Sequence, residues 1–317
     1  MDSIKMRFIA LKGRFIMDLK KLFGYEGKNV VITGSASGMS KAATELLIDL
    51  GANVYAIDLN PISLPVQKAF RANLANKDEI DTLIAELPET IDCVFLCHGI
   101  ATHPGNEMLV EKVNFLSQKY MAEKLLPRVK DNGSVTCISS FGGFGWEQVL
   151  PQVGGLLNAA SWEEALDWYA ANPAFYDTKR SASADYTFAK QCLNAYVVSK
   201  CHAPEYIGRK IRLNSICPGD TITGLSEDFY NTSSADGTTE NGKANVEAIF
   251  LNFWNGRPAT SEEMGYPLVC VGSDIFSYTS GQNIYIDYGL SSSYISMALN
   301  GQTGTAWEKA KDELKQK

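Results

Sequence analysis

A tyrosine and a lysine four residues apart, Tyr186 and Lys190, are the pair in this sequence whose types and spacing could do chemistry. On a helix, residues at this spacing lie one above the other on the same face. An ammonium group beside a phenol favours the phenolate, so the spacing predicts that Lys190 lowers the pKa of Tyr186 towards neutrality. A tyrosine tuned in this way can donate or accept a proton. The pair alone does not establish catalysis, because a half-buried tyrosine beside a solvated lysine has the same spacing.

A glycine-rich segment near the start of the chain predicts where a nucleotide could bind. Residues 28–34 have the pattern of a short buried strand, residues 41–50 that of a helix, and residues 53–58 that of the next strand. The turn at residues 33–40, TGSASGMS, lies between the first strand and the helix. Glycines let such a turn approach a pyrophosphate, and the helix start offers free N–H groups.

Asp58 ends the second of these strands, at about the spacing of twenty residues after the turn that is typical of a ribose-binding carboxylate. A carboxylate there accepts hydrogen bonds from a ribose 2′-hydroxyl and repels a 2′-phosphate. Leu59 and Asn60 add no cation, so the sequence favours NAD over NADP. The alternative role for Asp58 is that of a turn residue before Asn60 and Pro61.

Strands and helices alternate along the rest of the chain, which predicts an α/β fold: one domain with a doubly wound, Rossmann-type parallel sheet and helices on both faces. We expect further helices at residues 79–86, 110–126 and 184–200, and further strands at residues 93–97, 134–139, 211–216 and 283–286. The catalytic domain is expected to span residues 25–292, between a basic amphipathic extension (1–24) and a polar tail (293–317). Two long connections, an insertion at 141–183 and a loop at 221–260, follow strand ends, where such folds bind ligands.

The composition excludes several classes of protein. A net charge of −7 and a pI near 5.2 argue against a nucleic-acid binder. No apolar run is long enough to span a membrane. The seven cysteines show neither a disulfide framework nor metal-ligand spacing, so we expect no metal and reduced thiols in a cytoplasmic protein.

Between about residues 27 and 289 the chain resembles the short-chain dehydrogenase/reductase family. The turn at 33–40 is similar to the family's TGxxxGxG motif, with Ser40 in place of the third glycine, and Cys97-His98-Gly99 stands where Asn-Ala-Gly is usual. Residues 218–223 fit the family's PGxxxT motif. The resemblance implies the following cofactor-binding residues: Gly34, Ser37, Gly38, Met39, Asp58, Asn73, Gly99, Lys190, Pro218, Gly219, Thr221 and Thr223.

The resemblance also implies a catalytic set. Tyr186 corresponds to the acid/base and Lys190 to the lysine that holds the nicotinamide ribose. Ser140 corresponds to the serine that hydrogen-bonds the substrate oxygen, with Ser139 as the competing choice. Asn114 is similar to the asparagine that anchors a water in the proton relay. The implied activity is hydride transfer between NAD and a secondary alcohol or ketone.

The insertion at 141–183 is similar to that of the bacterial 3α-hydroxysteroid dehydrogenase/carbonyl reductase branch, which implies a hydroxysteroid or bile acid as substrate. Candidate substrate-contacting residues are His98, Phe141, Trp146, Phe229 and Trp254. His98 could instead pack against the cofactor or close the strand end, and the aromatic helix within the insertion could instead complete the core or a subunit contact. Other candidate functions are a dehydrogenase of a smaller cyclic, terpenoid or polyol alcohol, and a catalytically idle NAD-binding scaffold. A homo-oligomer, dimer or tetramer, is expected.

Overall fold

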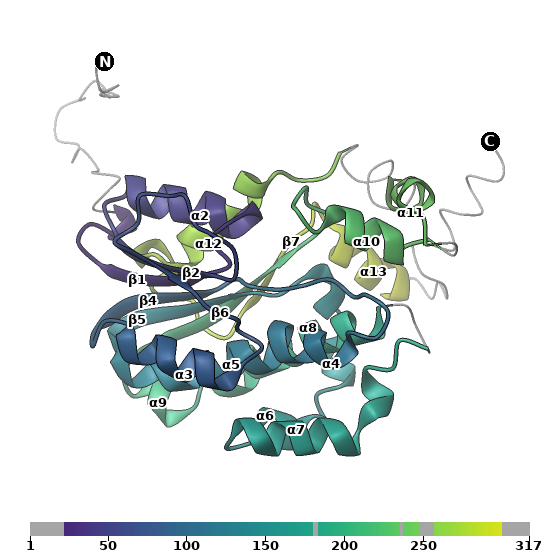
Figure 1. The fold of residues 1–317 in the computed structure, drawn as a ribbon, viewed down its shortest axis with the longest axis horizontal. Coiled ribbons are helices and arrows are strands. Elements are labelled where there is room, and N and C mark those ends of the chain that lie inside the picture. The colour runs from purple at the N-terminus through teal and green to yellow at the C-terminus, as the bar shows by residue number, and fades with distance from the viewer. Residues whose placement is uncertain (1–21, 180–182, 235–236, 248–256, 300–317) are drawn as a thin grey trace.

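One parallel sheet organises the molecule. The computed structural model describes residues 22–179, 183–234, 237–247 and 257–299, and over these residues seven strands lie in the order β3-β2-β1-β4-β5-β6-β7 (Figure 1). The strands are β1 (Asn29–Thr33), β2 (Asn53–Asp58), β3 (Lys68–Arg71), β4 (Ile91–Leu96), β5 (Val129–Ile138), β6 (Arg212–Pro218) and β7 (Asn283–Ile286). The chain builds outward from β1 in one direction and then from β4 in the other. This confirms the predicted doubly wound parallel sheet in a single domain.

Helices cover both faces of the sheet, and the side chains of each strand alternate between them. Along β1, Val30 and Ile32 enter the core beneath α2 (Gly38–Asp49) and α12 (Ser261–Gly272), whereas Val31 enters the core on the opposite face. The opposite face carries the helices α3, α4, α5, α8 and α9 (Figure 1). Their bounds are α3 (Lys77–Glu86), α4 (Glu107–Glu111), α5 (Ser117–Leu125), α8 (Ala184–Lys200) and α9 (Pro204–Ile207).

The predicted and observed elements differ where sequence periodicity is weak. β2, β7 and α8 have the predicted bounds, but β3 and α12 were not predicted. β3 is an edge strand that buries only Phe70, so it has no apolar run. The predicted helix at 110–126 is divided into α4, a π-helical turn (Lys112–Leu116) and α5. The predicted loop at 221–260 contains α10 (Ser226–Thr232) and α11 (Thr239–Val246).

The insertion forms an outer layer below the helices of one face. It contains α6 (Gly154–Leu157) and α7 (Trp162–Ala171), which lie beneath α5 and α8 in Figure 1. The Trp162 ring meets Tyr120 of α5 edge-on at 5.6 Å between centroids. The Trp168 ring stacks on Phe188 of α8 at 6.1 Å. The aromatic residues of α7 therefore complete the core, as one of the two alternatives predicted.

The last described helix, α13 (Leu290–Leu299), crosses the expected domain boundary at residue 292. Its Tyr294 ring lies 5.6 Å from Phe141 and 5.9 Å from Phe144, so α13 belongs to the folded body. Most of the predicted N-terminal extension, residues 1–21, lies outside the described residues. Within the described part of the chain, no helix has the length and apolar character needed to cross a membrane.

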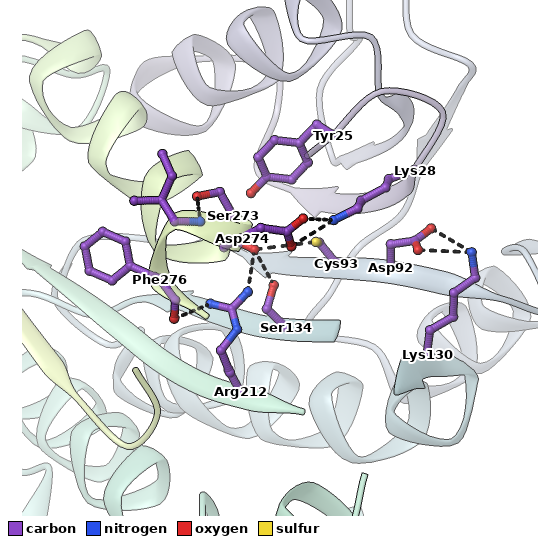
Figure 2. A network of polar contacts seen from close by, with 12 residues as sticks. Tyr25, Lys28, Asp92, Cys93, Lys130, Ser134, Arg212, Ser273, Asp274 and Phe276 are labelled. Carbon is purple, nitrogen blue, oxygen red and sulfur yellow. Dashed lines mark hydrogen bonds and ion pairs between the residues drawn. The ribbon is translucent and has the colours of Figure 1, made fainter. Parts of the chain in front are cut away.

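A buried arginine fixes the end of α12 at the amino edge of the sheet (Figure 2). The Arg212 guanidinium donates hydrogen bonds to the carbonyls of Val271 (2.7 Å) and Gly272 (2.9 Å), the last residues of α12. The Ser134 hydroxyl also donates to Gly272 (2.9 Å). A cation at a helix C-terminus satisfies the free carbonyls and the helix dipole together. The residues of the predicted active site lie at the opposite edge, where the strands have their carboxyl ends.

Candidate active site

Tyr186 and Lys190 lie in the first two turns of α8, at the carboxyl end of β5. The Lys190 ammonium stands 5.7 Å from the centroid of the Tyr186 ring. It donates a hydrogen bond of 2.9 Å to the carbonyl of Ile138, the last residue of β5. The side chain of Lys190 is buried, which holds this charge in one place. The predicted pair is therefore present on one helix face.

Ser140 joins this pair from the turn that follows β5. Its hydroxyl accepts the N–H of Gly142 at 3.0 Å, which fixes its rotamer, and it hydrogen-bonds the Tyr186 hydroxyl. Ser139 instead donates to the Lys190 backbone carbonyl at 3.3 Å and is buried. Of the two serines, Ser140 is thus the one that faces the tyrosine.

The protonation of the pair differs from the expectation. Burial raises the pKa of Tyr186 to about 12, although its hydrogen bond with Ser140 lowers it in part. Burial also lowers the pKa of Lys190 to about 8. The prediction that Lys190 brings the tyrosine pKa towards neutrality is wrong for these surroundings, because removal from water disfavours phenolate and ammonium alike. Tyr186 keeps part of its surface accessible, so solvent moderates its shift.

Asn114 lies in the π-helical turn between α4 and α5, a distortion that is frequent at functional sites. Its side-chain amide donates to the carbonyl of Ile100 (2.9 Å) and accepts the Ile100 N–H (2.8 Å). It therefore clamps the loop after β4. A Cβ added to Gly99 would stand 3.1 Å from the Asn114 amide oxygen and 3.8 Å from the Lys190 ammonium. The amide oxygen of Asn114 and the ammonium of Lys190 therefore both lie close to Gly99.

The glycine turn, residues 33–40, runs from the end of β1 into the start of α2, and we call it the glycine cradle. Gly34 and Gly38 have φ angles of +76° and +59°, a conformation that favours glycine. The Ser37 side chain makes no cap hydrogen bond at the start of α2. Ser40, in place of the third glycine, is buried and donates to the carbonyl of Thr33 at 2.7 Å. The substitution therefore preserves close packing of helix against strand.

Asp58 stands beside this cradle. One carboxylate oxygen accepts the N–H of Ala36 in the turn at 2.9 Å, and the other accepts the N–H of Asn60 at 2.8 Å. The turn role of Asp58 is thus present, and its carboxylate also contacts the glycine segment, while ribose binding stays a prediction. Arg71 on β3 is the register partner of Asp58, and its guanidinium donates to the carbonyl of Leu59 at 3.0 Å, a contact that local sequence did not indicate.

The segment after β6 closes the cradle from the other side. A Cβ on Gly38 would meet the Thr223 side chain at 3.5 Å, and one on Gly219 would meet Asp287 at 3.0 Å. Thr221 pairs with Ala259 in an isolated bridge. Pro218 ends β6, Met39 begins α2, and the Asn73 side chain caps its own turn by accepting the Ala75 N–H. A dinucleotide fits this arrangement, because glycines at close approaches, an uncapped helix start and a carboxylate lie along one edge.

Comparison with known proteins identifies the family. A family profile described as Enoyl-(Acyl carrier protein) reductase matches residues 177–291. Coniferyl-alcohol dehydrogenase from a Pseudomonas species is 30% identical over 271 residues, which cover 84% of this chain and 98% of the relative. This chain belongs to the short-chain dehydrogenase/reductase family. Dehydrogenase/reductase SDR family member 6 from Xenopus laevis is similar at 25% identity over 280 residues, again 84% of this chain and 98% of the relative.

Solved structures with the same fold include other short-chain dehydrogenases. The 3-alpha-hydroxysteroid dehydrogenase from Pseudomonas sp. B-0831, complexed with NADH, has a TM-score of 0.64 at 20% identity and covers 87% of this chain and all of its own. A gluconate 5-dehydrogenase of Beutenbergia cavernae described as putative, with bound NADP, has a TM-score of 0.62 at 22% identity and covers 84% of this chain and 98% of its own. These structures share the fold of this chain, and they hold NADH and NADP respectively. The predicted family is confirmed by the 30% identical relative.

The substrate candidates of this short-chain dehydrogenase/reductase divide into two groups. The Phe229 ring of α10 meets the Tyr186 ring edge-on at 5.0 Å, and Phe141 directly follows Ser140. His98 is buried, and its ring nitrogens lie 2.7 Å from the hydroxyl oxygens of Thr33 and Ser117. Burial lowers the pKa of His98 to about 3. Both ring nitrogens are thus engaged within the protein, which favours the strand-end alternative for His98 over contact with the substrate.

The other two candidates are Trp146 and Trp254. Trp146 packs against the core that α7 completes, and Trp254 lies outside the described residues. Sequence reasoning missed Tyr294, whose ring extends the aromatic wall formed by Phe141 and Phe144. The only sequence signal for it was an aromatic residue shortly after the last strand. Among the described residues no cluster of three or more potential ligands could hold a metal ion.

Proposed function

We propose that this protein is an NAD(H)-dependent oxidoreductase that interconverts an alcohol and a ketone or aldehyde at Tyr186. The observation that carries the proposal is the convergence of Ser140, Tyr186 and Lys190 beside the glycine cradle. A bound nicotinamide would donate or accept the hydride. Gly34, Gly38, Thr223 and Lys190 would hold the cofactor, and Asp58 would accept hydrogen bonds from its adenosine ribose.

The residues of the chain would move the proton. In the oxidising direction Tyr186 takes the hydroxyl proton while Ser140 hydrogen-bonds the substrate oxygen, on which negative charge develops. In the reducing direction Tyr186 donates its proton. Because the pKa of Tyr186 is raised to about 12, the protonated phenol dominates at neutral pH. Alcohol oxidation should therefore accelerate as the pH rises above 7, which initial rates across that range will test.

We propose a substrate with a flat, apolar body. Support comes from the aromatic side chains of Phe229 against Tyr186 and of Phe141, Phe144 and Tyr294 behind Ser140. The substrate class expected from the sequence is a hydroxysteroid or bile acid. The relative that is 30% identical over nearly its whole length favours a second candidate, a phenylpropenoid alcohol of the coniferyl type.

A panel assay separates these classes. NADH or NADPH formation would be measured with bile acids, coniferyl alcohol, cyclohexanols, terpenoid alcohols and polyols, using NAD and NADP in turn. Turnover of coniferyl alcohol but of no steroid would exclude the hydroxysteroid assignment, and the reverse result would exclude the phenylpropenoid one. Replacing Phe229 by Ala should change the ranking of bulky over small alcohols if this ring contacts the substrate.

The catalytic assignment has its own control. Tyr186→Phe should abolish turnover of the best alcohol while cofactor binding, measured by quenching of intrinsic fluorescence, persists. Unchanged turnover would refute the role of Tyr186. No turnover by the wild-type protein with any alcohol, together with cofactor binding, would favour an idle NAD-binding scaffold.

We further propose a cytoplasmic homo-oligomer, a dimer or tetramer. All seven cysteines are free, in keeping with a reducing compartment. Large apolar side chains are exposed on and after α12, among them Tyr266, Ile275 and Tyr278. Light scattering on the purified chain tests the assembly, and a monomeric mass would refute it.

A further inference from the structure

Two buried carboxyl groups lie beside the catalytic residues but take no part in the chemistry proposed above. Asp185 directly precedes Tyr186 in α8, and Glu111 ends α4, three residues before Asn114. Both residues have an exposed fraction of 0%. Burying a carboxyl group costs free energy unless hydrogen bonds replace the lost water. The hydrogen-bond partners of the two carboxyl groups therefore indicate which segments these groups hold in place.

Asp185 connects the first turn of α8 to the loop after β4. One of its carboxyl oxygens accepts the hydroxyl of Thr102 at 2.6 Å and the backbone N–H of Tyr186 at 2.7 Å. Thr102 lies in the loop that also contains Gly99 and Ile100. Since Asn114 clamps Ile100 from the other side, Asp185 ties Tyr186 to the same loop.

Glu111 connects α4 to the insertion. One of its carboxyl oxygens accepts the hydroxyl of Tyr169 in α7 at 2.9 Å, and Tyr169 is itself fully buried. One turn earlier on α4, Glu107 accepts the hydroxyl of Thr178 at 2.5 Å. Residues four apart lie on one face of a helix. The insertion is thus docked on α4 by two hydroxyl groups that donate to carboxyl groups on that face.

The second oxygen of each buried carboxyl group has no hydrogen-bond partner within the described ranges. Burial raises the pKa of Glu111 and of Asp185, and the Asp185 carboxyl adds to the shift at Glu111. Glu107 adds in turn to the shift at Asp185, while Lys179 faces Glu107. A neutral side chain of the same shape would therefore replace either buried carboxyl group with little change.

We propose that Glu111 and Asp185 are positioning residues through which the insertion at 141–183 sets the placement of Tyr186 and Asn114. The proposal rests on the proposed function of Tyr186. α7 itself packs on the core, so its influence on the reaction passes through Tyr169 and Glu111 to the π-helical turn. Asp185 and Thr102 hold the catalytic helix against the same loop.

Kinetics of matched variants test this. Tyr169→Phe and Thr102→Val each remove one hydroxyl donor, and a displacement of catalytic groups by a fraction of an ångström should lower kcat about 10-fold. The KM of the cofactor should stay unchanged, because its cradle is not touched. Tyr176→Phe is the matched control: its hydroxyl, from the same insertion, donates to the backbone carbonyl of Tyr169 at 3.2 Å. Its kcat should equal that of the wild type.

Conservative replacements separate positioning from general damage. Asp185→Ala should lose about as much kcat as Thr102→Val, whereas Asp185→Asn keeps the acceptor oxygen and should recover to within roughly 2-fold of wild type. In the Tyr169→Phe/Thr102→Val double variant, the losses should be less than multiplicative, since both act on one linked cluster. Full additivity, or equal activity of the Ala and Asn variants, would overturn the proposal.

A measurement without substrate distinguishes this proposal from the proposed function. Hydrogen exchange in the peptide covering residues 183–190, measured on the whole chain, reports the Tyr186 N–H that Asp185 accepts. Both single variants should speed this exchange several-fold, and Tyr176→Phe should not. If the wild type oxidises no alcohol, the proposed function fails while this readout still decides on positioning. Exchange unchanged in Tyr169→Phe would refute the link from the insertion to α8.

Discussion

Gly143 offers the sharpest test of how closely the active site is packed. It ends the short turn Phe141–Gly143 that follows Ser140, and it lies against α8. A Cβ added there would stand 2.8 Å from the Lys190 carbonyl and 2.5 Å from the Asn194 side-chain nitrogen. Ordinary contact begins at 3.4 Å, so the turn and the helix must separate by at least roughly 0.6 Å.

Gly143→Ala should therefore reduce both stability and activity. Overpacking of this kind costs about 1–3 kcal/mol, which corresponds to a fall in Tm of roughly 3–10 °C for a domain of this size. A misplacement of 1 Å near the chemistry costs about 100-fold, so half of that displacement should lower kcat roughly 10-fold. The expected cause is a shift of Ser140 relative to Tyr186 and Lys190.

The assay is thermal unfolding together with steady-state kinetics on the best alcohol of the panel. Gly154→Ala is the control, because a Cβ at this first residue of α6 would meet nothing within 4 Å. That control should keep the wild-type kcat and Tm. A wild-type kcat in Gly143→Ala, or equal losses in the two variants, would refute the contact between the turn and α8.

Three further predictions concern the cofactor, the fold and pH. Asp58→Asn should lower the ratio of kcat/KM for NAD to that for NADP by about 10-fold or more, because the charged group proposed to accept hydrogen bonds from the ribose is lost. An unchanged ratio would refute the proposed role of Asp58. Arg212→Met should cost about 3 kcal/mol by freeing buried carbonyls at the end of α12, with kcat nearly unchanged at the opposite edge of the sheet; chemical denaturation measures this. Burial raises the pKa of Glu111 well above 4.5, so the folded state binds the proton more tightly than the unfolded state. Stability should therefore fall as the pH rises above 4.5, and Glu111→Gln should flatten that fall in Tm measurements; an equally steep fall in the variant would contradict the assignment.

The sequence was sufficient for those parts of the protein that depend on local pattern. Buried strands joined by helices predicted the doubly wound sheet, because apolar runs and glycine turns need no distant partner to be recognised. The family motifs placed Asn114, Ser140 and the α8 pair at strand ends or on helices, where the structure brings them together. β3 was missed because it buries only one aromatic ring. α12 was missed although its start carries a local signal, the capping box formed by Thr260 and Glu263.

The tertiary structure decided everything that depends on distance through space. Local charge predicted a lowered tyrosine pKa, but burial of the whole pair raises the pKa of Tyr186 to about 12. His98 is bound between Thr33 and Ser117, residues 65 and 19 positions away, so no local pattern could show that it is occupied. Arg71 faces Asp58 across a strand pair, and Glu111 meets an insertion hydroxyl 58 residues later. Residue types and spacing set out the chemistry of Tyr186 and Lys190, whereas desolvation and long-range hydrogen bonds, which arise only on folding, set their protonation and placement.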